Sequence, residues 1–350
     1  MKMTVLFAFA SAALFGLSTP AAKILLGSVH PAMLAGLLYC GAGLGVAALR
    51  LLRAGRSGTR DVALGRRDVP WLVGAVLSGG VIGPLLLMIG LTGTEAATAS
   101  LLLTFEGAAT ALIAWLFFRE SYGLRLVLGM ACLVSGAAAL AWSGPPILSA
   151  MTGPLAIVGA CFAWSLDNNF TRKISLADPL QIVEIKGLVA GPVNLALGLW
   201  AGGSLPPLTT SLLAASIGFV GYGLSLVLFV LALRELGAAR TSAYFATAPF
   251  LGTLGAVVAL GDPVTVQLAG AGVLMAAGVW LHLTERHAHE HVHTAIGHSH
   301  PHVHDVHHQH AHAHEPSTTP GETHTHAHHH ELLTHAHPHT PDPHHDHGHA

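Results

Sequence analysis

Long hydrophobic runs recur along the first 284 residues of this 350-residue chain, and short stretches rich in glycine and proline separate them. Each run is about 20 residues long, which is the length of helix that crosses the hydrocarbon core of a bilayer. Glycine and proline between the runs mark the ends of helices. The pattern predicts an all-α integral membrane protein with ten transmembrane helices, at about residues 4–26, 32–52, 69–91, 95–118, 123–142, 152–171, 179–201, 210–233, 238–260 and 264–284. A secretory signal is the alternative for the first run, which is long for that role.

Charge supports the membrane class, because only 10% of the residues are charged, against about 25% in an ordinary soluble domain. Lysine and arginine between the predicted spans occur only in alternate connections. Basic connections stay on the cytoplasmic side of a membrane. We therefore expect a multi-pass protein of the inner (plasma) membrane with both termini in the cytoplasm. The basic residues of these connections are Arg50, Arg53, Arg56, Arg60, Arg66, Arg67, Arg119, Arg125, Arg172, Lys173, Arg234 and Arg240.

The chain contains an internal repeat. At an offset of 142 positions residues 96–100 align with 238–242, and Glu120 aligns with Asp262. Nearer the start of each half the offset is 149, which places Lys23 on Arg172. The repeat predicts two units of five spans, at residues 3–143 and 151–284, followed by a tail at 285–350. Because five is odd, the second unit is expected to be inverted in the membrane, an architecture of many secondary transporters.

These residues resemble a known family. The two five-span repeats, the segment Ala96–Ser100 and the pair Arg119-Glu120 are similar to the EamA family of the drug/metabolite transporter (DMT) superfamily. The resemblance covers about residues 3–284. It implies a ten-helix exporter of small molecules. Gly107 departs from the family pattern, which usually has proline there, whereas the second half keeps Pro249.

Ionisable side chains inside the predicted spans are candidates for a transport path. Burying one in a bilayer costs about 3 kcal/mol or more, so such groups usually face a bundle interior or an aqueous cavity. We expect Glu106 and Asp167, with Asn168 beside it, to lie in a polar path between the halves. For each candidate the alternative to a role in transport is a structural role, such as a hydrogen bond, a solvated helix end or a pairing with another helix. Lys186 is a candidate partner of Glu106 or Asp167. The full candidate set is Lys23, Glu106, Asp167, Asn168, Glu184 and Lys186.

Glycine and proline also interrupt two spans at matching places. Residues 78–84 read Ser-Gly-Gly-Val-Ile-Gly-Pro in the third span, and residues 221–223 read Gly-Tyr-Gly in the eighth. Paired interruptions of this kind mark substrate sites in transporters. Close packing of helices through small residues is the alternative explanation. The expected hinge positions are Gly79, Gly80, Pro84, Gly221, Gly223 and Pro249.

The tail is rich in histidine. The chain has 27 histidines, and only His30 and His282 precede residue 287. Polar residues, proline and threonine alternate with the histidines and leave no apolar face, so we expect a disordered tail. Neutral imidazole is a ligand for Ni, Co, Zn and Cu. The tail is therefore predicted to bind a divalent transition metal, with a pH-responsive or incidental tail as the alternative. The expected ligands include His287, His289, His291, His293, His298, His300, His302, His304, His324, His326 and His328.

Together these features predict a secondary transporter that exports a small solute or a divalent transition-metal ion such as nickel or cobalt. One alternative is an EamA-type exporter of metabolites, amino acids or drugs whose tail is a metal buffer or sensor. A second alternative is a membrane-anchored metal-binding protein. The chain contains no HExxH, GxSxG or Walker motif, so we expect no enzyme and no required cofactor. The expected partners are the bilayer and the transported solute or ion, without nucleic acid, and a homodimer is left open.

Overall fold

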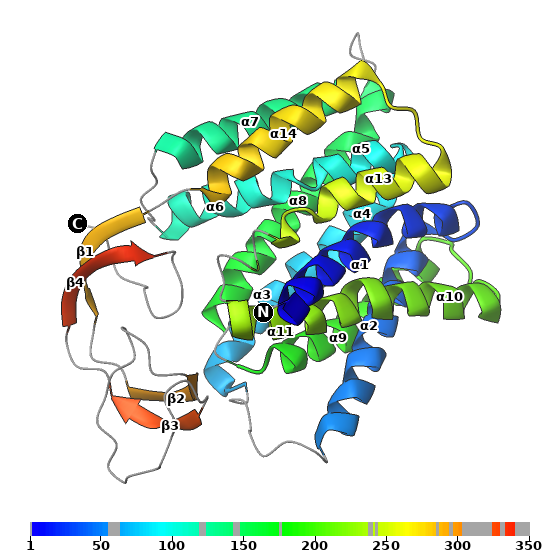
Figure 1. The fold of residues 1–350 in the computed structure, drawn as a ribbon. Coiled ribbons are helices and arrows are strands. Elements are labelled where there is room, and N and C mark those ends of the chain that lie inside the picture. Colours follow the sequence, from blue (N-terminus) through cyan, green and yellow to red (C-terminus); the bar gives the residue numbers. More distant parts are fainter. Residues whose placement is uncertain are drawn as a thin grey trace.

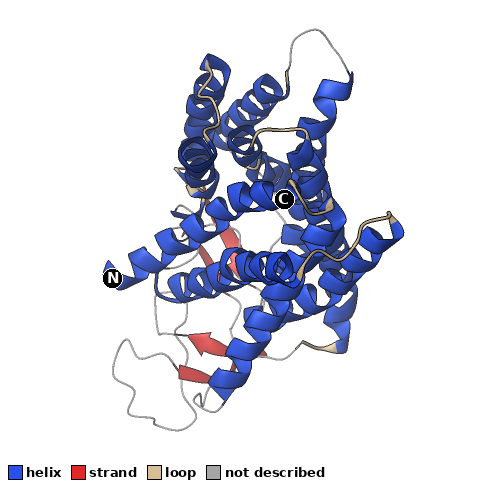
Figure 2. Ribbon diagram, turned by 90° about the vertical axis from the view of Figure 1, so that its right-hand side faces the viewer, coloured by secondary structure: helices blue, strands red, loops and turns tan. Residues whose placement is uncertain are grey.

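The computed structural model describes residues 2–54, 64–118, 124–142, 148–174, 177–236, 241 and 244–284, together with 287–293, 297–302, 324–329 and 333–339 in the tail. Arg119, Glu120, Arg240 and His304 lie outside these ranges. Helices form the bundle, and strands occur only in the described part of the tail (Figures 1 and 2).

The first half runs from α1 to α7. Its helices are α1 (Lys2–Leu26), α2 (Pro31–Ala54), the short 3₁₀ turn η1 (Arg66–Asp68), α3 (Val69–Ala75), η2 (Val76–Ile82), α4 (Gly83–Thr92), α5 (Ala96–Leu102), α6 (Phe105–Phe118) and α7 (Leu124–Ala141). The helix α3–η2–α4 is continuous, and its middle part η2 is π-helical. The interrupted glycine segment is thus a local change of helix type.

The second half repeats this order. Its helices are α8 (Leu148–Lys173), α9 (Pro179–Trp200), α10 (Leu208–Gly218), η3 (Phe219–Leu224), α11 (Ser225–Leu236), α13 (Ala248–Leu260) and α14 (Val266–Leu283). The segment η3 is again π-helical, between α10 and α11. The two predicted interruptions therefore share one local structure in corresponding helices.

Seven helical segments among the described residues are long and apolar enough to cross a membrane. The sequence predicts ten spans, and the fourth, sixth and ninth are not among the seven. A turn at Leu103–Thr104 divides the fourth into α5 and α6, and a turn at Ala246–Thr247 precedes α13 in the ninth. The sixth, α8, has 26 residues, but polar side chains fill its final turns. Two of these three spans carry path candidates, Glu106 in the fourth and Asp167 in the sixth.

Large apolar side chains cover the outside of the bundle. Leu51 is 77% exposed, Val258 76% and Val266 92%. Water does not favour so many exposed aliphatic side chains, whereas lipid tails do. This surface and the seven apolar segments indicate a multi-pass membrane protein.

Helix contacts follow the repeat. The second helices of the two halves, α2 and α9, pack on each other, as do the fifth helices, α7 and α14, which run side by side (Figure 1). Moreover α1 packs on α11 and α13, while its counterpart α8 packs on α4 and α6. Exchanging the halves therefore exchanges these contacts. The approach of α2 to α9 needs glycine, because a β-carbon on Gly187 would lie 2.5 Å from the Cα of Gly43.

The tail contains four short strands, β1 (His287–His293), β2 (Gly297–His302), β3 (His324–His329) and β4 (Leu333–His339). Strand β1 pairs antiparallel with β4, and β2 with β3. The alternation of histidine with other residues has the two-residue period of a strand. The disorder expected from composition stays a prediction.

Candidate functional site

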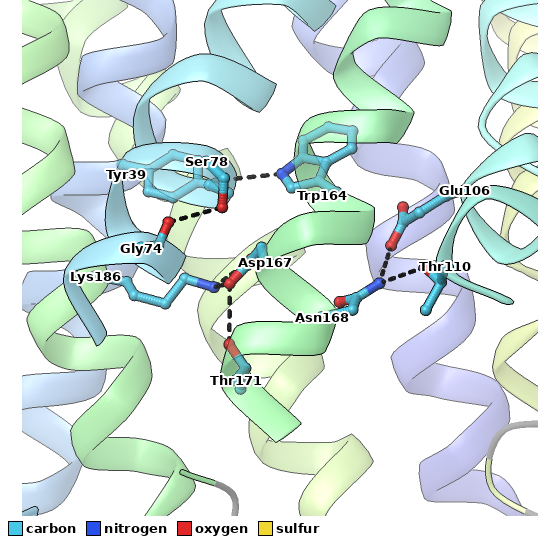
Figure 3. A network of polar contacts seen from close by, with 11 residues as sticks. Tyr39, Gly74, Ser78, Glu106, Thr110, Trp164, Asp167, Asn168, Thr171 and Lys186 are labelled. Atoms are coloured by element: carbon cyan, nitrogen blue, oxygen red, sulfur yellow. Dashed lines mark hydrogen bonds and ion pairs between the residues drawn. The ribbon is translucent and has the colours of Figure 1, made fainter. Parts of the chain in front are cut away.

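Helix α8 carries two polar clusters within the bundle, and both lie near its last turns (Figure 3). One is centred on Asp167 and the other on Asn168. Adjacent residues on a helix point about 100° apart, so the two clusters reach different neighbours. Asp167 reaches η2 and α9, whereas Asn168 reaches α6.

Asp167 is held by an ion pair and a hydroxyl. The Lys186 ammonium, from α9, donates to both carboxylate oxygens, at 2.7 Å to Oδ1 and 2.5 Å to Oδ2. Thr171 Oγ1 donates to Asp167 Oδ1 at 2.9 Å. The side chains of Asp167 and Lys186 are only 9% and 17% exposed. Each ion thus neutralises the other where burial of a lone charge would be costly.

The second cluster joins α8 to the start of α6. Asn168 Nδ2 donates to Glu106 Oε1 at 2.8 Å and to Thr110 Oγ1 at 3.3 Å. Ser165 Oγ donates to the Glu106 carbonyl at 3.1 Å. Glu106 belongs to the first half and Asn168 to the second, so this contact crosses between the halves. The turn at Leu103–Thr104 starts α6 just before Glu106 and places its carboxylate beside α8.

The π-helical segment η2 forms the wall beside Asp167. The Gly79 carbonyl accepts from Tyr39 Oη at 2.7 Å and from Trp164 Nε1 at 3.0 Å. The Gly80 carbonyl accepts from Asn194 Nδ2 at 2.9 Å. Tyr39, Trp164 and Asn194 are site residues that the sequence analysis did not single out. Asn194 offered a signal, since it is a polar amide in an otherwise apolar run.

Other candidates lie elsewhere. The Lys23 ammonium donates to the Leu91 carbonyl and, at 2.8 Å, to the Thr94 carbonyl, at the end of α4. Unpaired carbonyls at a helix end favour a cation. Glu184 forms an ion pair with Arg50, which also lies 3.4 Å from Asp178. The structure thus brings Glu106 to Asn168 and Lys186 to Asp167, in two clusters around α8. It does not bring Lys23 or Glu184 to them.

The hinge candidates are placed as follows. Gly79 and Gly80 lie in η2, Pro84 follows in the first turn of α4, and Gly221 and Gly223 lie in η3. Pro249 is in the first turn of α13. Gly107 lies in the first turn of α6, and a β-carbon there would meet nothing within 4 Å.

The predicted metal ligands lie in the tail. Except for His304, they belong to strands β1, β2 and β3, and the register places His289 opposite His337 and His300 opposite His326. Within the part of the chain that the structure describes, no three His, Cys, Asp or Glu residues form a group suited to a metal ion.

Comparison with known proteins decides the family. The model of the EamA-like transporter family matches residues 2–142 and again residues 151–284. The chain belongs to the EamA-like transporter family. The resemblance drawn from the residues is thereby confirmed, with the family model matching in each half.

This EamA protein is also similar to uncharacterized transporters. An uncharacterized transporter of Methanothermobacter thermautotrophicus is 31% identical over 281 residues, which is 76% of this chain and 82% of the relative. The uncharacterized transporter YvbV of Bacillus subtilis is 24% identical over 206 residues, or 57% and 67% of the two chains. A protein of known crystal structure superposes with a TM-score of 0.59 at 20% identity, over 80% of this chain and 95% of the other. That last likeness concerns the fold alone.

Proposed function

We propose that this EamA protein is a secondary transporter that exports a small solute, and that the polar face of α8 lines part of the path. The observation that carries the proposal is the convergence of contacts between the halves on α8, at Glu106–Asn168 and at Gly79–Trp164. Transport requires the halves to move against each other around a site between them. Polar groups placed at that boundary, inside an apolar bundle, are suited to contact a solute in passage.

The Asp167–Lys186 pair favours a small organic solute that carries an ionised group. A negative group on the solute can pair with Lys186 and a positive group with Asp167, and a solute that carries both groups leaves neither charge bare. A divalent cation bound at Asp167 would instead lie beside the Lys186 ammonium, and like charges repel. Amino acids meet this requirement, as do metabolites and drugs that carry ionised groups.

A second candidate is export of a transition-metal ion, and the histidine-rich tail favours it. In each strand pair, histidines of the two strands lie opposite each other, such as His289 with His337 and His300 with His326, and imidazole binds Ni, Co, Zn and Cu. In this case the tail collects the ion and delivers it to the bundle. A protein that only anchors the tail to the membrane would bind metal without transport.

The test compares three variants in cells that express the protein. Asp167→Asn and Glu106→Gln remove the charges of the path, and Glu184→Gln is the matched control because Glu184 pairs with Arg50 away from α8. We expect wild-type cells to release at least one solute into the medium, measured by mass spectrometry of metabolites and by elemental analysis for nickel and cobalt. The first two variants should lose this release at normal abundance in the membrane, and Glu184→Gln should keep it.

A wild type that releases nothing more than cells without the protein contradicts export. Equal release by wild type, Asp167→Asn and Glu106→Gln removes α8 from the path. Release of metal rather than an organic solute selects the second candidate.

We further propose that the protein lies in the inner membrane with both termini in the cytoplasm and with inverted halves. The alternation of basic connections supports this orientation, and the exchange of helix contacts between the halves supports a two-fold relation. A reporter fused after Ala350 tests the orientation. We expect activity from a cytoplasmic reporter, and activity from a reporter that works only outside the cytoplasm would contradict it.

A further inference from the structure

One backbone carbonyl in η2 lacks a donor from its own helix. In η2 the Gly83 N–H donates to the Ser78 carbonyl, five residues back. In this π-helical register the next carbonyl, that of Gly79, would need the N–H of residue 84, but residue 84 is proline and has none. Pro84 therefore leaves the Gly79 carbonyl to find donors outside α3–η2–α4.

Two other helices supply these donors. Tyr39 from α2 and Trp164 from α8 both donate to the Gly79 carbonyl, at 2.7 and 3.0 Å. Trp164 is 7% exposed, so the carbonyl lies where an unmade hydrogen bond is expensive. The two side chains thus hold η2 between α2 and α8.

Gly79 also packs against the carboxylate of the ion pair. A β-carbon on Gly79 would lie 1.9 Å from Asp167 Oδ2, so the carboxylate packs directly on the Gly79 backbone. Trp164 precedes Asp167 by three residues on α8, which places both on one face of the helix. Holding the Gly79 carbonyl therefore fixes the wall beside Asp167.

We propose that Tyr39 and Trp164 are positioning residues, which hold η2 against α8 through the Gly79 carbonyl and so keep Asp167 paired with Lys186. The inference rests on the proposed function only in that the pair belongs to the transport path. Losing either donor releases η2, removes the wall beside the carboxylate and lets the pair separate.

Lysine footprinting tests this without any solute. The chain has four lysines, Lys2, Lys23, Lys173 and Lys186. The purified protein is treated briefly with a water-soluble amine-reactive reagent, and labelling of each lysine is followed by mass spectrometry. In wild type Lys186 should be protected by Asp167, and Asp167→Asn defines its labelling without the pair.

Tyr39→Phe decides the outcome, because it removes one hydroxyl and keeps the ring. We expect Lys186 to be labelled about fivefold faster in Tyr39→Phe and in Trp164→Phe, which corresponds to the loss of one hydrogen bond of about 1 kcal/mol. Ser78→Ala is the matched control. It removes a hydroxyl of η2 that donates to the Gly74 carbonyl, in the turn before, and should label as wild type does.

Lys23 reports on the fold, because it is held by carbonyls at the end of α4 and should label equally in all variants. Unchanged protection of Lys186 in Tyr39→Phe, beside fast labelling in Asp167→Asn, overturns the proposal. So does an Asp167→Asn variant in which Lys186 stays protected. Neither result depends on export, so failure of this inference and failure of the proposed function remain distinguishable.

Discussion

At the scale of single residues, the polar groups of the bundle differ in the partners they have. Asp167 has a cation and a hydroxyl, whereas the Glu106 carboxylate is held by the Asn168 amide. Lys23 is bound to backbone carbonyls at a helix end. An ion pair, an amide contact and a helix cap differ in how readily they exchange partners when the halves move. The residues around α8 are suited to exchange partners, and the helix cap is suited to hold one end of α4.

Gly79→Ala is predicted to disturb this site directly. The new β-carbon would lie 1.9 Å from Asp167 Oδ2, so either the carboxylate or η2 must shift. Overpacking of this kind costs about 1–3 kcal/mol. We expect a lower thermal unfolding midpoint and loss of export, measured by a stability assay in detergent and by solute release from cells.

The matched control is Gly107→Ala, where the new methyl group would meet nothing within 4 Å. It should behave as the wild type in both measurements. If Gly79→Ala also matches the wild type, the carboxylate does not rest on Gly79 in the working protein.

At the scale of helices, the two π-helical segments occupy corresponding places but are not equivalent. In η3 the Ser225 N–H donates to the Val220 carbonyl, just as Gly83 donates to Ser78 in η2. The residue after Ser225 is Leu226, which has an N–H, whereas the residue after Gly83 is Pro84. Of these two π-helical segments, only η2 therefore frees a carbonyl in this way, and η2 is the one that packs beside Asp167 of α8.

Pro84→Ala is predicted to weaken the hold on η2. The new N–H competes with Tyr39 and Trp164 for the Gly79 carbonyl, since it continues the register of the π-helical segment. We expect reduced export with unchanged or raised thermal stability, because the helix gains a hydrogen bond.

Pro192→Ala is the control, since Pro192 also lies inside a helix, α9, but does not follow a π-helical segment. It should leave export unchanged. A Pro84→Ala variant that exports as well as the wild type would mean that the missing N–H has no role in transport.

At the scale of the whole molecule, the bundle and the tail are held together by different contacts. The bundle is held by helix pairs such as α2 with α9 and α7 with α14, which relate one half to the other. The tail follows α14, and its strands pair with one another. Removing the tail therefore removes no helix of the bundle.

The tail is predicted to bind metal in a pH-dependent way. Only neutral imidazole is a ligand, and its ordinary pKa is about 6.5, so affinity for nickel, cobalt or zinc should fall steeply between about pH 7 and pH 5. Calorimetric titration of the purified full-length protein, compared with protein that ends at Arg286, measures this directly.

If metal is the cargo, the truncated protein should need a higher metal concentration for half-maximal export, with a smaller effect on the maximal rate. Equal metal binding by the full-length and the truncated protein would contradict a metal-binding role of the tail. Binding by the tail with unchanged metal efflux would instead favour an organic solute.

Hydropathy, charge and repeats in the sequence determined the membrane class, the family and the sites of helix interruption. Hydropathy and helix interruption are local properties: a run of about 20 apolar residues favours a membrane helix, and glycine with proline disturbs its own turn. The same reasoning placed Glu106 and Asp167 among the candidates, because any carboxylate in an apolar run stands out.

Only the tertiary structure decided which partner each group takes. The sequence leaves Glu106 and Asp167 as alternative partners of Lys186, and it does not separate Lys23 and Glu184 from path residues. Tyr39 and Trp164 resemble ordinary aromatic side chains of a span. A hydrogen bond or ion pair exists only when two groups come within about 3 Å. That distance depends on how closely distant helices approach, as Gly43 and Gly187 allow for α2 and α9, and no local pattern records it.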